Sequence, residues 1–324
     1  MLAIVCPGQG SQTPGFLSPW LELPGVREHL ESLSAIAGLD LIAHGTVSDE
    51  ETIKDTAVAQ PLIVAAGLMA ARLLVEPKAL TASTVVAGHS VGEITASALA
   101  GALTEPDALI FVRERANAMA RAAAETPTGM SAVLGGDPEE VAAALAAAGL
   151  TAANANGGGQ TVAAGTLEQL AAFAAAPPAK ARVIPLKVAG AFHTSHMAPA
   201  VSVLENLRPQ LRPAAPLPTL LSNYDGAAVV SGEANLDSLI SQVSRPVRWD
   251  VCMESMAAMG VTGMLELPPA GTLTGLARRG LKGMPTLALK SPEDLDAARE
   301  FIAEHSGTAA AVAAAATTTG EGNA

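Results

Sequence analysis

Short apolar runs alternate with longer amphipathic segments along the first 125 residues of this chain. Leu2–Cys6 and Thr84–Ala87 have the length of strands buried on both faces, whereas Pro61–Val75 and Pro106–Ala124 have the length and apolar spacing of helices. Strands that alternate with helices form a mostly parallel sheet covered by helices on both faces. The pattern therefore predicts an α/β fold.

The middle of the chain has a different rhythm. Strands are expected at residues 130–134, 152–156, 161–164 and 182–186. Asp137 and Thr166 are expected to cap two intervening helices. The resulting order β-α-β-β-α-β is that of a ferredoxin-like unit. We therefore predict a small subdomain at 127–188, inserted into a discontinuous catalytic domain formed by 1–126 and 189–306.

Helical and strand patterns return after the inserted segment. Helices are expected from Met197 to Leu211, from Asn235 onward and at Leu273–Arg279, with strands at Thr219–Ser222 and Met264–Leu267. From residue 308 the chain is rich in Ala and Thr. Such low-complexity sequence predicts a disordered tail at 307–324.

Composition and charge narrow the class of protein. The 324 residues are 49% hydrophobic with a net charge of -12, and no Lys/Arg cluster is interleaved with aromatic residues, which argues against nucleic-acid binding. Cys6 and Cys252 lie far apart, so neither a disulfide nor a metal site is favoured. The N-terminus lacks a basic leader, and no apolar run approaches the roughly 20 residues of a membrane span. We expect a cytoplasmic protein without membrane contacts.

The clearest chemical signal is Gly88-His89-Ser90-Val91-Gly92-Glu93, a G-x-S-x-G element that follows the expected strand at 84–87. A sharp turn from strand to helix exposes the serine hydroxyl, and flanking glycines allow close backbone approach. The following helix offers free N–H groups to a developing oxyanion. The pattern indicates a nucleophilic serine at Ser90.

A serine nucleophile needs a base, and the chain offers six histidines. His89 adjoins the serine but points elsewhere on an elbow, and the surroundings of His29, His44 and His305 predict surface positions. His193 and His196 follow the inserted segment and therefore face the crevice between the two units. Residue chemistry alone leaves both open as the base. The pair lacks the glutamate of a zinc-binding H-E-x-x-H helix, so we expect no metal.

The glycine-rich loop Pro7–Gln12 follows the first expected strand. It lacks the third glycine of a dinucleotide-binding G-x-G-x-x-G and the Gly-Lys-Ser/Thr of a phosphate-binding loop. An amide side chain, Gln9, remains at the carboxyl end of a parallel strand. That position suits an oxyanion-hole donor, with a purely structural turn as the alternative.

Seven motifs occur in one order along the chain. They are Pro7-Gly8-Gln9-Gly10-Ser11-Gln12, Ala59-Gln60-Pro61, Gly88–Glu93, Arg115 with Met119, Asn154-Ala155-Asn156, Ala191-Phe192-His193 and Pro246-Val247-Arg248-Trp249. Together they resemble the malonyl-CoA:acyl carrier protein transacylases and the related acyltransferase domains of polyketide synthases. The resemblance runs from Leu2 to about Ser306. It implies an α/β-hydrolase-like core with a ferredoxin-like subdomain, which agrees with the order of elements above.

The resemblance also implies roles for individual residues. It makes Ser90 the nucleophile, His193 the general base and then acid, and Arg115 the partner of the malonyl carboxylate. Gln9 and the backbone N–H of Val91 would form the oxyanion hole.

Further positions follow from the same resemblance. Met119, Phe192, Gln60 and Asn156 would bind substrate, and a backbone carbonyl near Arg248 would orient the base. Asp250 leaves a conventional triad open as the alternative. Because Met119 and Phe192 can crowd the α-carbon of the acyl group, we expect malonyl to be preferred over methylmalonyl.

The implied activity is transfer of malonyl from malonyl-CoA to the phosphopantetheine thiol of acyl carrier protein, through an O-malonyl-serine in a ping-pong reaction that serves fatty acid or polyketide synthesis. We expect a monomer without a bound cofactor.

Because carrier proteins of this pathway are typically acidic, docking is expected on Arg278, Arg279 and Lys282. A second candidate patch is Lys180, Arg182 and Lys187.

Three alternatives remain at this stage. The G-x-S-x-G element alone is equally typical of a serine esterase or thioesterase. A non-catalytic module of the same fold is disfavoured by the presence of both Ser90 and His193. An acyltransferase dedicated to a polyketide pathway or to malonate decarboxylation would have the same sequence features.

Overall fold

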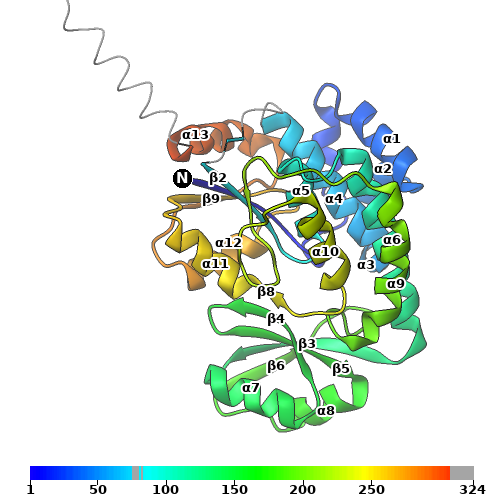
Figure 1. The fold of residues 1–324 in the computed structure, drawn as a ribbon, viewed down its shortest axis with the longest axis vertical. Coiled ribbons are helices and arrows are strands. Elements are labelled where there is room, and N and C mark those ends of the chain that lie inside the picture. Colours follow the sequence, from blue (N-terminus) through cyan, green and yellow to red (C-terminus); the bar gives the residue numbers. More distant parts are fainter. Residues whose placement is uncertain (75–79, 82, 307–324) are drawn as a thin grey trace, which may run out of the picture.

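The computed structural model describes residues 1–74, 80–81 and 83–306. Its larger part is built on a five-stranded parallel sheet with the order β10–β9–β1–β2–β7 (Figure 1). These strands are β1 (Leu2–Cys6), β2 (Thr84–Gly88), β7 (Thr219–Leu220), β9 (Gly263–Glu266) and β10 (Thr286–Ala288). The α/β fold with a mostly parallel sheet is therefore confirmed.

Strand β1 lies at the centre of this sheet, and all five of its residues are buried. Leu2, Ile4 and Cys6 contribute to the core on one face, whereas Ala3 and Val5 contribute to the core on the other. This alternation follows from the two-residue period of a strand. Both faces must therefore be covered by helices, which explains the continuous apolar run in the sequence.

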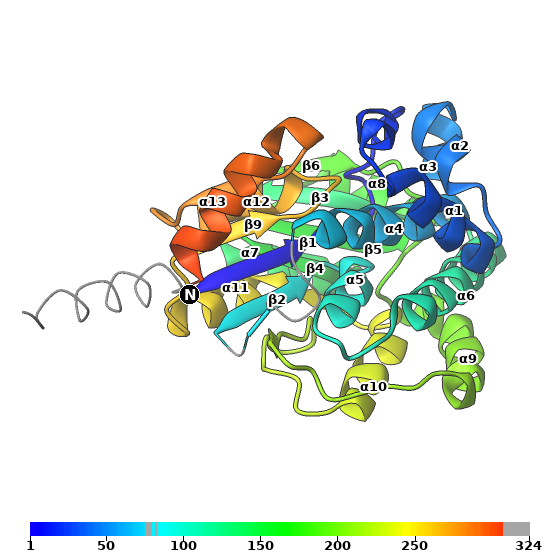
Figure 2. The ribbon, with the colours of Figure 1, turned by 90° about the horizontal axis from the view of Figure 1, so that it is seen from above.

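Helices cover both sides of the sheet, as the view from above shows (Figure 2). They are α1 (Val26–Ala37), α2 (Leu41–Thr46), α3 (Glu50–Lys54), α4 (Thr56–Leu74), α5 (Gly92–Leu99), α6 (Glu105–Glu125), α9 (Ala198–Leu207), α10 (Gly232–Gln242), α11 (Trp249–Ala258), α12 (Thr272–Gly280) and α13 (Leu295–His305). Buried residues of α11 and α12 pack on the face that carries Ala3 and Val5. The other face packs against α4, α5 and α6.

The prediction for the first long helix was wrong at its start. Helix α4 begins at Thr56, so Pro61 lies inside it. The carboxylate of Asp55 accepts a hydrogen bond from the N–H of Ala57 at 2.7 Å and so satisfies one free donor of the first turn. Length and composition would allow α4 to cross a membrane, but 67% of its apolar window is buried within the protein. The predicted helical residue Val75 lies outside the described residues.

The second sheet has the order β6–β3–β5–β4–β8. Its elements are β3 (Thr128–Gly135), α7 (Pro138–Ala147), β4 (Thr151–Gly157), β5 (Gln160–Thr166), α8 (Leu167–Ala175), β6 (Ala181–Pro185) and β8 (Val247–Arg248). The first four strands pair antiparallel in the ferredoxin-like order, and Asp137 and Thr166 cap the two helices as predicted. Helices α7 and α8 lie on the outer side of this sheet (Figure 1).

Strand β8 was not predicted. It comes from the segment after α10 and pairs in parallel with β4, through Asn154 with Val247 and Ala155 with Arg248. The chain that leaves the larger part thus contributes an edge strand to the smaller sheet. A two-residue strand carries no periodicity of its own, so the sequence offers no signal for it.

The predicted helix at Met197–Leu211 is divided into three pieces. Short 3-10 helices at Ser195–Met197 and Arg208–Gln210 flank α9, which ends at Leu207. Pro209 lies just beyond this end, where it cannot donate the hydrogen bond that would continue the helix. The predicted tail at 307–324 lies outside the described residues.

Candidate active site

Ser90 lies between β2 and α5 in a left-handed backbone conformation, with φ of 54°. Such a conformation is rare for a residue with a Cβ atom and marks a strained turn. A Cβ added to Gly88 would lie 2.0 Å from the carbonyl carbon of Gly92, and one added to Gly92 would lie 2.1 Å from the oxygen of Cys6. Both glycines are thus required by close packing of the elbow, as its sequence predicts.

His193 meets this serine. Its Nε2 atom lies 2.7 Å from the Ser90 hydroxyl, and its Nδ1 atom lies 2.8 Å from the main-chain oxygen of Gln242. A carbonyl only accepts, so Nδ1 carries the proton and Nε2 is left to accept the serine proton. His193 also has a positive φ of 61°. The structure therefore assembles a serine–histidine pair in a defined tautomer. His196 lies instead in the 3-10 helix Ser195–Met197.

The expected orientation of this base was wrong in one detail. The accepting carbonyl belongs to Gln242 at the end of α10, not to Arg248. The Arg248 side chain instead forms a bidentate pair with Asp250, at 2.9 and 3.0 Å. Asp250 is thereby engaged with Arg248, and the conventional triad is not formed in this structure.

Arg115 lies beside the same serine and is 1% exposed. Its Nη1 atom donates to the Gln60 side-chain oxygen at 2.6 Å, and its Nη2 atom donates to that of Gln242 at 2.7 Å. Nη2 also reaches the Ser90 hydroxyl at 3.3 Å. The guanidinium is thus held by two neutral amide oxygens, close to the atom that would carry an acyl group.

Burial and charge set the protonation states of these groups. Burial first, and then the positive charge of Arg115, lower the pKa of His193 to about 3, so the imidazole is neutral at physiological pH. Burial also lowers the pKa of Arg115 to about 10, opposed by the charge of Glu93. Burial raises the pKa of Glu93 to about 7, opposed by hydrogen bonds from Asn223 and Gln242.

The loop after β1 lies against the elbow. A Cβ on Gly8 would lie 2.8 Å from the carbonyl oxygen of His89. The amide side chain of Gln9 turns away from the serine, however, and donates to the oxygens of Lys54 and Thr56 at 3.3 Å each. The expectation that this side chain is an oxyanion donor is therefore wrong, because its N–H groups are used elsewhere.

Main-chain N–H groups offer a different donor set. At the start of α5 the N–H groups of Gly92 and Glu93 bond to the carbonyls of His89 and Ser90. The N–H of Val91 makes no such bond within the described part of the chain. It therefore remains available to an oxyanion next to Ser90.

The other predicted substrate-binding residues lie around this centre. Gln60 is buried in α4 and bridges the Gln9 oxygen, at 3.4 Å, to the sulfur of Met119, at 3.7 Å. Phe192 is buried next to His193. Asn156 is also buried, and its Oδ1 atom lies 2.9 Å from His89 Nε2, so it links the smaller sheet to the elbow.

Three residues of the site were missed by the sequence analysis. Glu93 is 1% exposed and contacts both Gln242 and the main chain of Asn223. The Asn223 side chain accepts from the Ser90 N–H at 2.8 Å and donates to the Gly88 oxygen at 2.6 Å. Glu93 belongs to the recognised serine motif, which was the one available signal. No motif pointed to Gln242 or Asn223.

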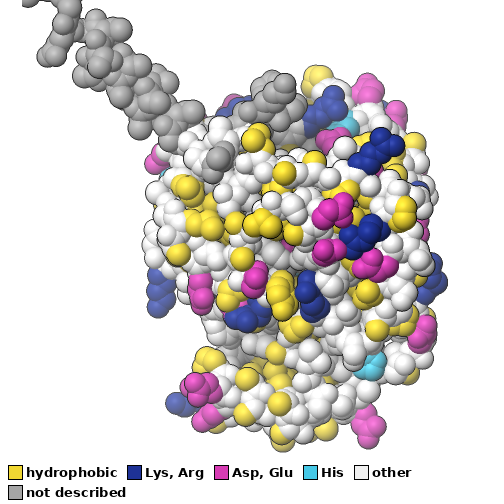
Figure 3. Space-filling view, in the orientation of Figure 1, with side chains coloured by type: hydrophobic (Ala, Val, Ile, Leu, Met, Phe, Trp, Pro, Cys, Tyr) yellow, Lys and Arg dark blue, Asp and Glu magenta, His cyan; other side chains and the backbone are white. Residues whose placement is uncertain are grey.

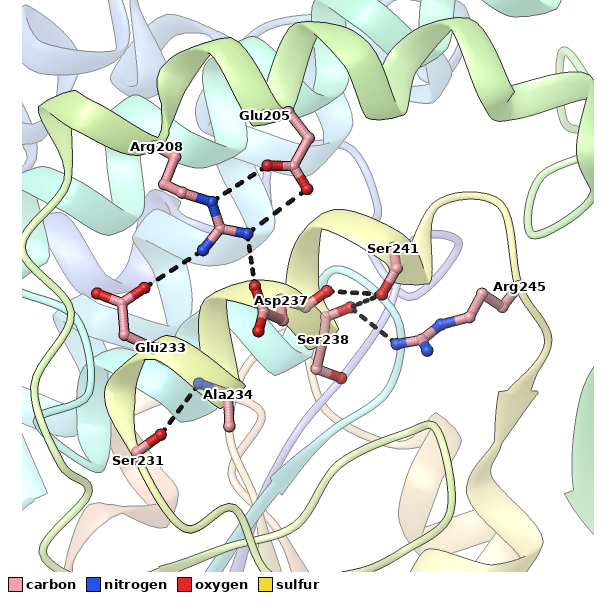
Figure 4. A network of polar contacts seen from close by, with 9 residues as sticks. All are labelled: Glu205, Arg208, Ser231, Glu233, Ala234, Asp237, Ser238, Ser241 and Arg245. Atoms are coloured by element: carbon pink, nitrogen blue, oxygen red, sulfur yellow. Dashed lines mark hydrogen bonds and ion pairs between the residues drawn. The ribbon is translucent and has the colours of Figure 1, made fainter.

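Helix α10, which ends at Gln242, is tied to the segment after α9 by Arg208 (Figure 4). The Arg208 guanidinium contacts the carboxylates of Glu205, Glu233 and Asp237, and the last two belong to α10. At the other end of the network, Arg245 lies over the Tyr224 ring, 4.2 Å from its centroid. These contacts hold α10, whose last residue supplies the carbonyl that bonds to His193.

The remaining histidines and the cysteines lie outside this centre. His29 and His305 are buried rather than at the surface as predicted, where they bond to Glu105 and Thr262 respectively. His29 packs in α1 towards α6, an environment that its charged sequence neighbours conceal. Both cysteines are buried and free. Among the described residues, no group of three or more His, Cys, Asp or Glu could hold a metal ion.

Comparison with known proteins places this chain in a family. A model of the acyl transferase domain matches residues 3–315. A malonyl CoA-acyl carrier protein transacylase from Mycobacterium tuberculosis is 52% identical over 297 residues, which cover 91% of this chain and 98% of the relative. The crystal structure of MCAT from Mycobacterium tuberculosis matches with a TM-score of 0.88 and 51% identity, and covers 92% of this chain and 99% of that one.

A further match is a type II polyketide synthase acyl-carrier protein in complex with its malonyl-transacylase. Its TM-score is 0.84 at 30% identity, with 92% of this chain and 99% of that chain covered. Each of these matches spans nearly the full length of both chains. The chain therefore belongs to the acyl transferase domain family.

Proposed function

We propose that this protein transfers the malonyl group from malonyl-CoA to the phosphopantetheine thiol of an acyl carrier protein. The observation that carries the proposal is the position of a buried guanidinium, Arg115, 3.3 Å from the hydroxyl of a serine paired with histidine. A serine–histidine pair explains acyl transfer, and a buried cation beside it favours an acyl group with a free carboxylate. The names of the similar transacylases support the same substrates.

The first half-reaction follows from the tautomer of the base. The Ser90 oxygen attacks the thioester carbonyl while its proton passes to Nε2 of His193, which then donates a proton to the departing coenzyme A sulfur. Nδ1 keeps its proton on the Gln242 carbonyl throughout. The Val91 N–H and the main-chain N–H of Gln9 are proposed to stabilise the tetrahedral oxyanion.

The second half-reaction repeats the chemistry in reverse. The carrier thiol gives its proton to His193, its sulfur attacks the ester carbonyl, and the Ser90 oxygen leaves and recovers a proton from the same histidine. Each half-reaction forms one acyl bond and breaks one, so no bound cofactor is needed. Coenzyme A thioester and carrier-bound phosphopantetheine are substrates.

Arg115 links substrate choice to the strength of the base. Its positive charge is one of the causes that lower the pKa of His193. A malonyl carboxylate paired with Arg115 neutralises that charge and makes His193 a stronger base, whereas an acetyl group leaves the charge in place. Gln60 and Gln242 hold the guanidinium for this pairing. Met119, Phe192 and Asn156 are proposed to shape the acyl and pantetheine sites.

The test is to mix the protein with malonyl-CoA, quench the reaction and measure the mass of the protein. We expect one malonyl adduct, on the peptide that contains Ser90. When holo-carrier protein is added, this adduct should disappear and carrier-bound malonyl should appear. Ser90→Ala is the control. Release of free malonate in place of carrier-bound malonyl would identify a thioesterase. An adduct on another residue would contradict the assignment of Ser90.

The carrier protein is proposed to dock beside α12. The side chain of Arg279 donates to the oxygen of Gln160 on β5 at 2.9 Å, so the end of α12 lies where the two sheets meet. Arg278 and Lys282 are exposed there. On the face drawn in Figure 3, Lys and Arg side chains are dispersed among Asp and Glu. An acidic partner would therefore be attracted mainly where basic residues gather, as Arg278, Arg279 and Lys282 do in the sequence.

Charge reversal separates the two candidate docking patches. Arg278→Glu leaves the hydrogen bond between Arg279 and Gln160 intact. It is expected to raise the apparent KM for carrier protein and to flatten the salt dependence of this KM, with acylation by malonyl-CoA unchanged. Arg182→Glu tests the second patch. Arg27→Glu on α1, at the far side of the larger part from α12, is the matched control (Figures 1 and 2). An effect of Arg182→Glu alone would move the docking site to the second patch.

A cytoplasmic location is proposed from its substrates, since coenzyme A thioesters and carrier proteins of this pathway are cytoplasmic reactants. Secretion of the protein in a cell-fractionation experiment would contradict it.

A further inference from the structure

Glu93 occupies the centre of the buried polar network around Ser90. It is 1% exposed in the first turn of α5, and both of its carboxylate oxygens accept hydrogen bonds. Oε1 accepts from the Asn223 N–H at 2.8 Å, and Oε2 accepts from the side-chain amide of Gln242. Through these two partners Glu93 is connected to Ser90, Arg115 and His193.

The first partner supports the elbow. Asn223 accepts the Ser90 N–H and donates to the Gly88 oxygen, so its side chain brackets the strained turn from both sides. The Ser90 backbone is in the left-handed region and needs such support. Glu93 holds the main chain of Asn223 and thereby fixes the position of this bracket.

The second partner controls Arg115. Gln242 donates through Nε2 to Glu93 and to the Ser90 carbonyl oxygen, the latter at 3.0 Å, and so both of its amide protons are used. Its Oε1 atom is then left to face Arg115, at 2.7 Å. A flipped amide would place Oε1 against two oxygens and an NH2 group against the guanidinium. The carboxylate therefore determines which end of the amide faces the cation.

The position of the Glu93 carboxylate relative to Arg115 also affects substrate binding. Glu93 is the negative charge that offsets the burial of the Arg115 guanidinium, and the Gln242 amide separates the two groups. A carboxylate in direct contact with Arg115 would compete with the carboxylate of the substrate for the same donors. A carboxylate one amide away supports the cation without binding its donors directly.

We propose that Glu93 is a positioning residue that, through the Gln242 side chain, orients Arg115 and so sets selectivity for acyl groups with a free carboxylate. The inference rests on the proposed malonyl transfer. It assigns to Glu93 a role in substrate choice, which a group that only stabilises the fold would not have.

The test compares acylation rates with malonyl-CoA and acetyl-CoA in single turnovers above the pKa of about 7 of Glu93, where this group is a carboxylate. Glu93→Gln brings an amide against the Gln242 amide, and we expect the malonyl-to-acetyl ratio to fall about 10-fold or more. The double variant Glu93→Gln with Gln242→Glu restores an amide–carboxylate pair but places the negative charge at position 242, in contact with Arg115. We expect its ratio to fall by about 100-fold, because the carboxylate introduced at position 242 occupies the donors that the substrate needs.

A matched control is Glu266→Gln. Glu266 is a buried carboxylate that accepts the Leu273 and Thr274 N–H groups at the start of α12, and its hydrogen bonds do not involve Arg115 or Gln242. Its loss should lower stability but leave the malonyl-to-acetyl ratio unchanged. Thermal unfolding of each variant separates lost folding from lost selectivity.

The outcomes are distinct. If the wild-type protein gains no malonyl on Ser90, the proposed function fails. If the wild-type protein is malonylated and folded Glu93→Gln keeps its malonyl-to-acetyl ratio, Glu93 does not set selectivity and the inference is overturned. A wild-type ratio in the double variant would overturn it as well, because it would show that the position of the negative charge does not affect the choice of acyl group. If Glu93→Gln does not fold, the double variant, which keeps the 93–242 hydrogen bond, decides alone by the same criterion.

Discussion

Replacement of Arg115 by alanine is the sharpest test of how this site recognises its substrate. The guanidinium is almost fully buried and donates to Gln60, Gln242 and the Ser90 hydroxyl. Arg115→Ala would leave the malonyl carboxylate in a buried site without a cationic partner. Breaking a buried charge pair costs about 3–5 kcal/mol. At about 1.4 kcal/mol per factor of ten, kcat/KM for malonyl-CoA should fall about 10²- to 10⁴-fold.

The acetyl substrate is expected to behave differently. It has no carboxylate to strand, and removal of the positive charge raises the pKa of His193, since Arg115 is the second cause of its depression. Acylation by acetyl-CoA should therefore fall much less, or rise. The measurement is single-turnover acylation of Ser90 with each thioester, with thermal unfolding to confirm that the variant is folded.

Arg113 provides a matched control on the same helix. Its side chain is 36% exposed and bonds to Glu114 and to the Ile36 carbonyl. Arg113→Ala should change both acylation rates little. An equal loss on malonyl-CoA and acetyl-CoA in Arg115→Ala would refute the reasoning, because it would make Arg115 a structural residue rather than a carboxylate partner.

Three further predictions concern the neighbouring groups. Ser90→Ala should abolish the acyl-enzyme and lower turnover by about 10⁴-fold or more, as measured by intact mass and by transfer assays. His193→Ala should slow acylation by about 10²- to 10⁴-fold while His196→Ala has little effect, and the reverse ranking in single turnovers would exclude His193 as the base. Burial raises the pKa of Glu93 from 4.5 to about 7, so this group makes the folded state less stable as pH rises through that window. The unfolding free energy of Glu93→Gln minus that of the wild type should therefore increase by about 3 kcal/mol as pH rises from about 4 to 8. Chemical denaturation measures this difference, and a value that is constant with pH would exclude the titration of Glu93.

Much of the fold was predictable because its elements are regular. Strands β1 and β2, helix α6 and the ferredoxin-like order of the second sheet follow from apolar periodicity and from capping residues such as Asp137 and Thr166. The misses have local causes. Asp55 moves the start of α4 ahead of Pro61, and strand β8 consists of two residues that only the pairing with β4 defines. The boundaries of the two domains stay a prediction.

The burial of Arg115 could have been found in the sequence. Phe111, Arg115 and Met119 are spaced by four residues, so they share one face of α6, and all three are buried. Arg113, two residues earlier, lies on a different face and is partly exposed. An arginine within an apolar stripe is costly unless it has partners and a use. This spacing distinguishes two arginines that otherwise look alike.

The carbonyl that orients His193 could not have been predicted. Every residue carries a main-chain carbonyl, so the identity of Gln242 says nothing about which oxygen reaches the imidazole. Its position depends on the end of α10, which Arg208 anchors through Glu233 and Asp237. The nearby Asp250 is the more familiar choice from sequence, but it is engaged with Arg248.

A neutral partner for the base suits a substrate that carries its own negative charge. Arg115 and His193 both contact the Ser90 hydroxyl, so an aspartate in place of the Gln242 carbonyl would lie close to the guanidinium that we propose binds the malonyl carboxylate. It would attract Arg115 in the free enzyme and repel the malonyl carboxylate that we propose Arg115 binds. The carbonyl fixes the tautomer of His193 without adding charge, and the buried carboxylate of Glu93 is separated from Arg115 by the amide of Gln242. Gln242 thus takes part in both proposed functions, because its main-chain oxygen orients His193 and its side-chain oxygen holds Arg115.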